Sequence, residues 1–321
     1  MNIFAPSYFL TTTTVGAGMG LFLNNFSGGL TDSNLTSAAV GAAFGAVMGG
    51  ASLLMSPNPD KPRHSQLRSV YRDLLRDRYR VVKQFESNKT AQVFLALEKG
   101  SNRQVILKLP KPTMDRYDVC FRSGEIKREY QAIIEISEKT DSSHVARVID
   151  FFSGGDGENY WFICVLEYVV GPTLREEIDK GLLTLARLKE IFPSLAEGLR
   201  DVYKAGYDHG DMKPENVILN PERGAVLIDF QFANYTDRPK WALDEWCELL
   251  YESITGRQGN FSSEKTVRNI LEERDILQPS EAASAEALQK IVDRALQKPG
   301  VIPYPDFDSF VEELHQWEIS Q

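Results

Sequence analysis

The chain has 321 residues and a formal net charge of −9. This length is enough for one large domain and a short additional segment. This acidic balance argues against a nucleic-acid-binding protein, because such a protein needs a basic face. The three cysteines are dispersed and form no C-x-x-C pair. Neither a zinc site nor a disulfide framework is therefore expected, and a reducing compartment is the simplest interpretation.

The first part of the chain, residues 1–55, is apolar and rich in glycine. Asp32 is its only charged residue, and it separates the apolar stretches 8–30 and 36–55. The second stretch is uncharged and long enough to cross a bilayer as a helix. The sequence therefore predicts a helical hairpin that is embedded in the membrane through residues 8–55.

Gly41, Gly45 and Gly49 recur every four residues and would share one face of the second helix. Such a glycine zipper lets helices pack closely in lipid, which predicts self-association through this face. Glycine and alanine give only a weak insertion signal, so a flexible or soluble-packed arm is the alternative. Lys61 and Arg63 follow the hairpin, and basic flanks of this kind stay in the cytoplasm. We therefore expect a membrane-associated protein whose C-terminal domain is cytoplasmic.

A proline-rich linker over residues 56–67 separates this hairpin from the rest of the chain, because its prolines stop a helix. Beyond it, apolar periodicity predicts a helix at 66–76, strands at 78–82, 92–96 and 103–108, a helix at 125–138, and strands at 144–153 and 160–169. Helical periodicity then predicts helices at 174–180, 185–205, 244–255, 263–273, 285–296 and 308–317. The pattern predicts an α+β protein in which an antiparallel sheet precedes a helical part.

The densest chemistry lies in one octapeptide and a dipeptide that follows it. The octapeptide is His209-Gly210-Asp211-Met212-Lys213-Pro214-Glu215-Asn216, and Asp229-Phe230 comes thirteen residues later. Together they supply a base, a cation and two oxygen ligands for Mg²⁺ at the spacing that phosphoryl transfer requires. These motifs resemble the catalytic loop, H-R-D-x-K-x-x-N, and the D-F-G motif of the eukaryotic-like Ser/Thr protein kinase superfamily.

The resemblance covers about residues 68–321 and implies a bilobal fold. The N-lobe, over 68–170, would hold the antiparallel sheet, and the C-lobe, over 171–321, would be helical. The resemblance also implies ATP and Mg²⁺ as cofactors and a protein as the substrate.

The catalytic roles follow from the resemblance, position by position. Asp211 would accept a hydrogen bond from the substrate hydroxyl, and Lys213 would neutralise charge on the γ-phosphate. Asn216 and Asp229 would hold the Mg²⁺ ions.

Two further positions concern the other end of the triphosphate. Lys108, at the end of the third strand, would pair with the α- and β-phosphates. Glu129 shares a helix face with Ile126 and Ile133 and is the expected partner of that lysine. Glu125, one turn earlier, is the alternative.

The expected adenine site lies around residues 164–169, which resemble the hinge between the lobes, with Leu166 at the gatekeeper position. Backbone groups of Glu167 and Val169 would read the adenine edge. The apolar walls would come from Val93, Ile106 and Ile218. An ordinary core position is the alternative for each of these residues.

The chain departs from the family pattern in three places. Glu86, Asn88 and Ala91 replace the glycines of the phosphate loop, which should weaken or reshape triphosphate binding. Gln231 follows Asp229-Phe230 in place of glycine, which favours one fixed state. Gly210 replaces the arginine that normally receives a phosphate, so switching by this route is not expected.

The segment between Asp229 and Asp244 is also very short, so the expected protein is divergent, with a minimal activation segment. The sequence predicts a membrane-anchored, constitutively configured Ser/Thr protein kinase. One alternative is a pseudokinase that acts as a nucleotide-binding or scaffold module. The other is a small-molecule or lipid kinase.

Overall fold

The computed structural model describes residues 77–85, 91–111, 116–154, 160–181, 183–236 and 239–320. The predicted hairpin, the linker and the helix at 66–76 lie outside these residues and stay predictions. In the part of the chain that is described, none of the helices has both the length and the apolar character to span a bilayer.

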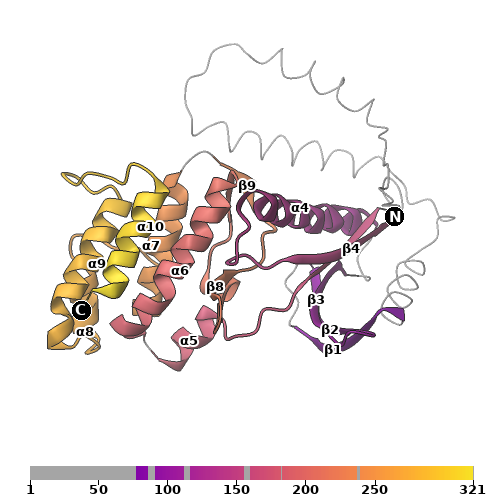
Figure 1. Cartoon of the computed structure of the whole chain (residues 1–321), viewed down its shortest axis with the longest axis horizontal. Coiled ribbons are helices and arrows are strands. Elements are labelled where there is room, and N and C mark those ends of the chain that lie inside the picture. Colours follow the sequence, from indigo (N-terminus) through magenta and orange to yellow (C-terminus); the bar gives the residue numbers. More distant parts are fainter. Residues whose placement is uncertain are drawn as a thin grey trace, which may run out of the picture. The chain divides into compact units, whose positions relative to one another are not determined.

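An antiparallel sheet forms the first half of the described structure (Figure 1). Its strands, in the spatial order β1-β2-β3-β5-β4, are β1 (Tyr79–Gln84), β2 (Ala91–Glu98), β3 (Gln104–Pro110), β5 (Trp161–Glu167) and β4 (Val148–Gly154). The central strands are rich in Val, Ile, Leu and Phe, and successive residues of β5 are buried, so this part of the sheet is covered on both faces. In the register of the sheet, Lys108 on β3 lies between Val93 on β2 and Cys164 on β5.

One long helix, α4 (Arg116–Thr140), packs against this sheet. The sequence predicted it only from residue 125, whereas the helix begins at Arg116. Gly124 lies inside the helix, and Val119 and Ser123 before it are buried. Their packing outweighs the intrinsic cost of a helical glycine, which is about 1 kcal/mol.

The second half is helical, as predicted. It contains α5 (Leu174–Lys180), α6 (Leu185–Lys204), α7 (Pro239–Thr255), α8 (Val267–Glu273), α9 (Ala282–Ala295) and α10 (Phe307–Ile319). Helix α7 begins before the predicted residue 244, because Pro239 fits the first turn of a helix. Trp246 of α7 is fully buried and donates a hydrogen bond to Phe192 O of α6 at 3.1 Å.

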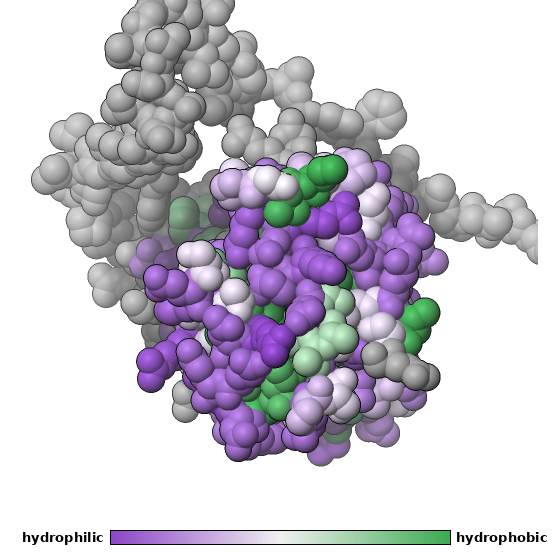
Figure 2. All heavy atoms as spheres, turned by 90° about the vertical axis from the view of Figure 1, so that its left-hand side faces the viewer, coloured by the Kyte–Doolittle hydropathy of each residue, from purple (hydrophilic) through white to green (hydrophobic). Residues whose placement is uncertain are grey.

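The helices α8 to α10 turn their apolar residues inward. Leu288, Phe310 and Leu314 are fully buried. Figure 2 shows that the face on the left of Figure 1 is mostly hydrophilic, with apolar residues in small separate patches. The core of this half therefore lies beneath α9 and α10.

Four very short strands lie around the octapeptide, whose last three residues form a 3₁₀ turn, η2 (Pro214–Asn216). Strand β6 (Tyr207–Asp208) pairs with β9 (Asn234–Tyr235), and β7 (Val217–Asn220) pairs with β8 (Gly224–Leu227). The sequence did not predict these strands, because two to four residues carry too little alternation to detect. A further 3₁₀ turn, η3 (Pro279–Glu281), precedes α9.

Candidate active site

A buried ion cluster joins the two halves of the molecule. Lys108 Nζ lies 2.7 Å from Glu129 Oε2 and 2.6 Å from Asp229 Oδ1. The three side chains come from β3, from α4 and from the segment after β8, and each is at least 87% shielded from solvent. One ammonium is thus held between two carboxylates.

Within the cluster, Lys108 and Asp229 keep their charges because opposite charges stabilise them, whereas burial raises the pKa of Glu129 above its ordinary value. Burial alone would lower the pKa of Lys108, but Glu129 and Asp229 raise it above its ordinary value. Burial would likewise raise the pKa of Asp229, and Lys108 instead lowers it. At neutral pH Lys108 is therefore a fixed cation and Asp229 a fixed anion.

Glu129, rather than Glu125, is the partner of Lys108. Glu125 forms an ion pair with Arg122 on its own helix at 2.8 Å. Glu129 also accepts a hydrogen bond from Phe230 N at 3.2 Å, a contact that the sequence did not indicate. Helix α4 is thereby tied to the Asp229-Phe230 dipeptide as well as to β3.

Packing in the core anchors the Asp229-Phe230 dipeptide. Phe230 is fully buried, and its ring centroid lies 4.6 Å from that of His209. His209 is also fully buried and bonds through Nε2 to Ile228 O at 2.9 Å, and burial lowers its pKa. Asp229 has a φ of +66°, a strained conformation that persists only where its surroundings hold it.

The remaining predicted catalytic residues converge on Asp211. Lys213 Nζ donates a hydrogen bond to Asp211 Oδ2. Asn216 Nδ2 donates to Asp211 O at 2.8 Å and to Oδ2 at 3.3 Å. The η2 turn brings Asn216 back toward Asp211 for these contacts.

Gly210 cannot be replaced by the arginine that is usual at its position without moving the backbone. Its φ is +76°, and a Cβ atom there would lie 2.2 Å from Phe232 O. Glycine is the residue that adopts this conformation without strain.

The predicted Mg²⁺ ligands fit the ion in chemical type. Asn216 uses its Nδ2 for Asp211, which leaves Oδ1 for a cation, and Asp229 keeps Oδ2 beside the oxygen that Lys108 holds. Carboxylate and amide oxygens suit this hard cation. In the described ranges no three or more His, Cys, Asp or Glu residues gather as a metal site.

The predicted adenine-site residues lie around the join between β5 and α5. Val169 is buried in a small cluster against which Ile218 packs, and Ile106 lies opposite Leu166 in the sheet. Val93 is half-buried opposite Lys108. No cluster unites all of these side chains within the described structure.

The side chain of Glu167 forms an ion pair with Arg223. Its Oε1 accepts a hydrogen bond from Arg223 Nη1 at 2.6 Å, and Arg223 also donates to Ser143 O and Val145 O. The backbone N–H of Glu167 donates to Arg147 O at 2.8 Å, so neither the side chain nor this N–H is open to a nucleotide. In the phosphate loop, Glu86 and Asn88 lie outside the described residues, whereas Ala91 begins β2 and is buried.

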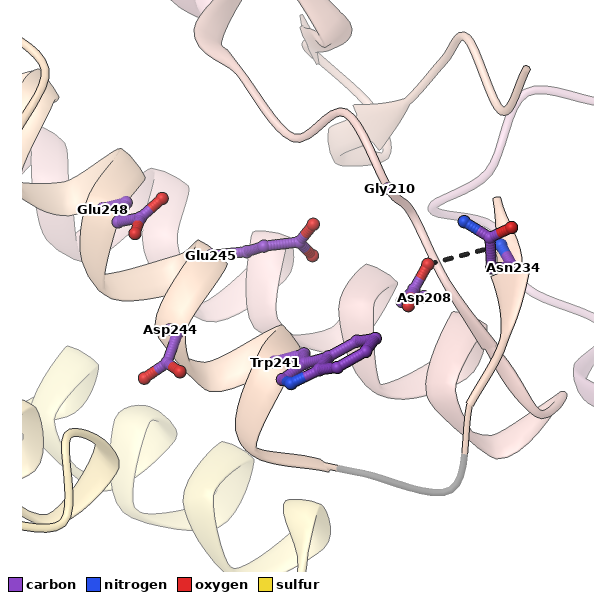
Figure 3. Close-up of a pocket in the computed structure, with 7 residues that line it drawn as sticks. All are labelled: Asp208, Gly210, Asn234, Trp241, Asp244, Glu245 and Glu248. Atoms are coloured by element: carbon purple, nitrogen blue, oxygen red, sulfur yellow. Dashed lines mark hydrogen bonds between the residues drawn. The ribbon is translucent and has the colours of Figure 1, made fainter. Parts of the chain in front are cut away.

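An open pocket of about 370 Å³ lies beside the octapeptide (Figure 3). It is lined by Asp208, Gly210, Asn234, Trp241, Asp244, Glu245 and Glu248. Glu245 and Trp241 point from α7 toward the chain at Asp208 and Gly210. The sequence did not predict this pocket, because Asp208 and Gly210 are far along the chain from the acidic residues of α7.

Glu245 is the most perturbed acid of the pocket. Burial and the charges of Asp208 and Glu248 raise its pKa to about 8. A hydrogen bond from the Gly210 backbone acts in the opposite direction and lowers the pKa. Its Oε2 is buried and has no hydrogen-bond partner among the residues that the structure describes. At neutral pH the folded protein therefore holds a proton on this carboxyl group.

The raised pKa of Glu245 predicts how the free energy of unfolding depends on pH. Because the pKa of Glu245 is raised on folding, wild-type stability should fall as pH rises from about 5 to about 8. Glu245→Gln cannot ionise, so its free energy of unfolding should exceed that of the wild type by an amount that grows across this window. With a discount for partial exposure, we expect a gain of about 2 kcal/mol at the alkaline end.

Urea unfolding of both proteins at several pH values measures this difference. A difference that stays constant from pH 5 to about 8.5 would mean that Glu245 titrates normally in the folded state.

Comparison with known proteins places this geometry in a family. The protein kinase domain model matches residues 79–256, which is more than half of the chain. Similar proteins include the serine/threonine-protein kinase pkn2 of Myxococcus xanthus, 28% identical over 51% of this chain and 19% of that protein. The probable serine/threonine-protein kinase PkwA of Thermomonospora curvata is 30% identical over 50% of this chain and 20% of its own length.

The serine/threonine-protein kinase PknA of Nostoc sp. is also 30% identical, over 49% of this chain and 28% of its own length. The chain therefore spans less than a third of each of these relatives. The antiparallel sheet, the helical half and the match over residues 79–256 agree with a bilobal kinase fold. The chain belongs to the protein kinase family.

Proposed function

We propose that this protein transfers the γ-phosphoryl group of ATP to a Ser or Thr hydroxyl of a protein substrate. The observation that carries the proposal is the buried cluster of Lys108, Glu129 and Asp229, with Asp211 and its partners on the neighbouring loop. The bacterial relatives, which are named as serine/threonine-protein kinases, support the same substrate class.

Lys108 would bind the α- and β-phosphates of the nucleotide. Glu129 holds its ammonium in place, and Phe230 N in turn holds Glu129. Asn216 and Asp229 would hold Mg²⁺, which would neutralise charge on the phosphates when it is bound. Val93, Ile106, Val169 and Ile218 would line the adenine site.

Asp211 would orient the attacking hydroxyl by accepting its hydrogen bond. The carboxylate is already fixed by Asn216 and Lys213, so the substrate meets an ordered base. Lys213, freed from Asp211 when substrate enters, would place its charge on the transferred phosphoryl group.

The proposed enzyme needs no activating phosphate. The Lys108–Glu129 pair is formed and Phe230 is fully buried in the unmodified chain. Gly210 has no side chain with which to receive a phosphate. These features support a constitutively configured active site.

Autophosphorylation with radiolabelled ATP and Mg²⁺ tests the proposal, with dephosphorylated casein as a second acceptor. The wild type should incorporate label into protein, and Asp211→Ala should lower the rate roughly 10²- to 10⁴-fold, because it removes the base. Asp308→Ala is the matched control: this exposed aspartate pairs with Lys204 on the helical surface, and its loss should change the rate less than about twofold.

The alternatives give different results in the same assay. Nucleotide binding without any transfer would favour a scaffold module, to which the glycine-free phosphate loop also points. Label found only in a lipid or small-molecule fraction would favour a small-molecule or lipid kinase, an alternative that the short segment after Asp229 suggests.

The proposal extends to membrane anchoring through residues 8–55, with the kinase domain in the cytoplasm and self-association through the Gly41, Gly45 and Gly49 face. The uncharged stretch 36–55 and the basic residues after it support this part.

Carbonate-resistant pelleting of the full chain in cell membranes should be strong and should disappear on deletion of residues 1–60. A full-length chain that remains entirely in the carbonate supernatant would contradict anchoring.

A further inference from the structure

Arg175, the second residue of α5, links two carboxylates from distant parts of the chain. Its Nε donates a hydrogen bond to Glu215 Oε1 at 2.9 Å, and its Nη2 donates to Glu252 Oε1. Glu215 belongs to the η2 turn and Glu252 to α7. Two donors of one planar guanidinium therefore fix the distance between the catalytic loop and α7.

The α7 end of this link is rigid. The side chain of Glu252 is 9% exposed, and within the described residues Arg175 is the side chain with which it pairs. A buried carboxylate that would otherwise be unpaired holds its partner strongly. The pair with Glu252 therefore anchors Arg175 to α7, and Arg175 contacts the catalytic loop from this fixed position.

Helix α5 gives the arginine a fixed origin as well. Thr173 caps the helix with a reciprocal capping box, and its backbone forms a bridge with Ile218 of β7. Leu174 and Ile178 are buried beneath the helix. The guanidinium is therefore supported from two sides.

The other end of the link lies inside the catalytic loop. Glu215 stands between Lys213 and Asn216, the residues that hold Asp211. The turn itself is closed by a bond from Asn216 N to Lys213 O at 2.9 Å. A restraint on Glu215 is consequently a restraint on the backbone from which these two side chains project.

We propose that Arg175 is a positioning residue that holds the catalytic loop in register through Glu215. The inference rests on the function proposed above, because it concerns how Asp211, Lys213 and Asn216 are aligned. The side chain of Glu215 is 49% exposed, and an exposed ion pair adds little to stability. The effect of Arg175 should therefore appear in loop geometry and turnover.

The test is a double-mutant cycle for Arg175 and Glu215. It is made in the full chain on a Glu252→Gln background, in which the Gln Oε1 can still accept the Arg175 hydrogen bond and removal of the arginine leaves no buried charge unpaired. Arg175→Gln and Glu215→Gln should each lower kcat roughly tenfold relative to that background, with the KM for ATP changed less than about twofold. The double variant should lose no more than either single variant, because both remove the same contact.

A matched control is available on the opposite part of the helical half. Arg268 also bridges two carboxylates, Glu272 and Glu286, each at 2.7 Å. Arg268→Gln should leave kcat and KM unchanged within about twofold, since it touches no catalytic element.

A second readout does not depend on activity. Hydrogen exchange of the backbone amides of residues 211–217 should accelerate in Arg175→Gln on the same background, while exchange in α9 stays unchanged. A wild type that transfers no phosphate would refute the proposed function, and the exchange data would still decide the role of Arg175.

Three outcomes would overturn the inference: additive losses of kcat in the double variant, a loss confined to the KM for casein, or unchanged exchange in the loop. The second of these would place Arg175 and Glu215 in substrate binding.

Discussion

The structure depends on one buried cation held between two carboxylates. Removing Lys108, Glu129 and Asp229 from water is costly, and the cost is offset only when all three meet at hydrogen-bonding distance. Their elements are distant in sequence, so the sheet, α4 and the segment after β8 must all be correctly placed for the cluster to form. Two carboxyl groups surround a single ammonium, and this excess of acidic groups suits a neighbouring divalent cation.

The other features of the site extend from this cluster. Glu129 contacts Phe230 N, Phe230 packs on His209, and His209 lies at the start of the catalytic loop. Arg175 then ties the end of that loop to α7. The catalytic loop thus has contacts at both ends that lead back to buried groups, Phe230 at the start and Glu252 at the end, which accounts for an ordered arrangement without any modification of the chain.

The sequence predicted those parts of the fold and the site that depend on residues close together in the chain. Motif spacing singled out Asp211, Lys213, Asn216 and Asp229, and the helical face shared with Ile126 singled out Glu129. The order of strands and helices followed from periodicity and is observed, although the sequence placed the start of α4 too late. The apolar hairpin and the phosphate loop lie outside the described residues.

The parts that the sequence missed depend on long-range contacts. No local pattern relates Arg175 to Glu252, or Glu245 to Asp208, because only the folded chain brings these residues together. The conformation of Gly210 likewise depends on Phe232 O, which lies on another segment. Very short strands such as β6 and β9 exist only as a pair.

The most direct test of the central claim is the thermal stability of the protein at increasing concentrations of ATP with Mg²⁺. If the cluster forms a nucleotide site, ATP–Mg²⁺ at about 100 times its Kd should stabilise the wild type by about 2.7 kcal/mol. Lys108→Ala and Asp229→Asn should each lose most of this gain. Equal stabilisation of all three proteins, or of none, would contradict the claim that this cluster binds the phosphates.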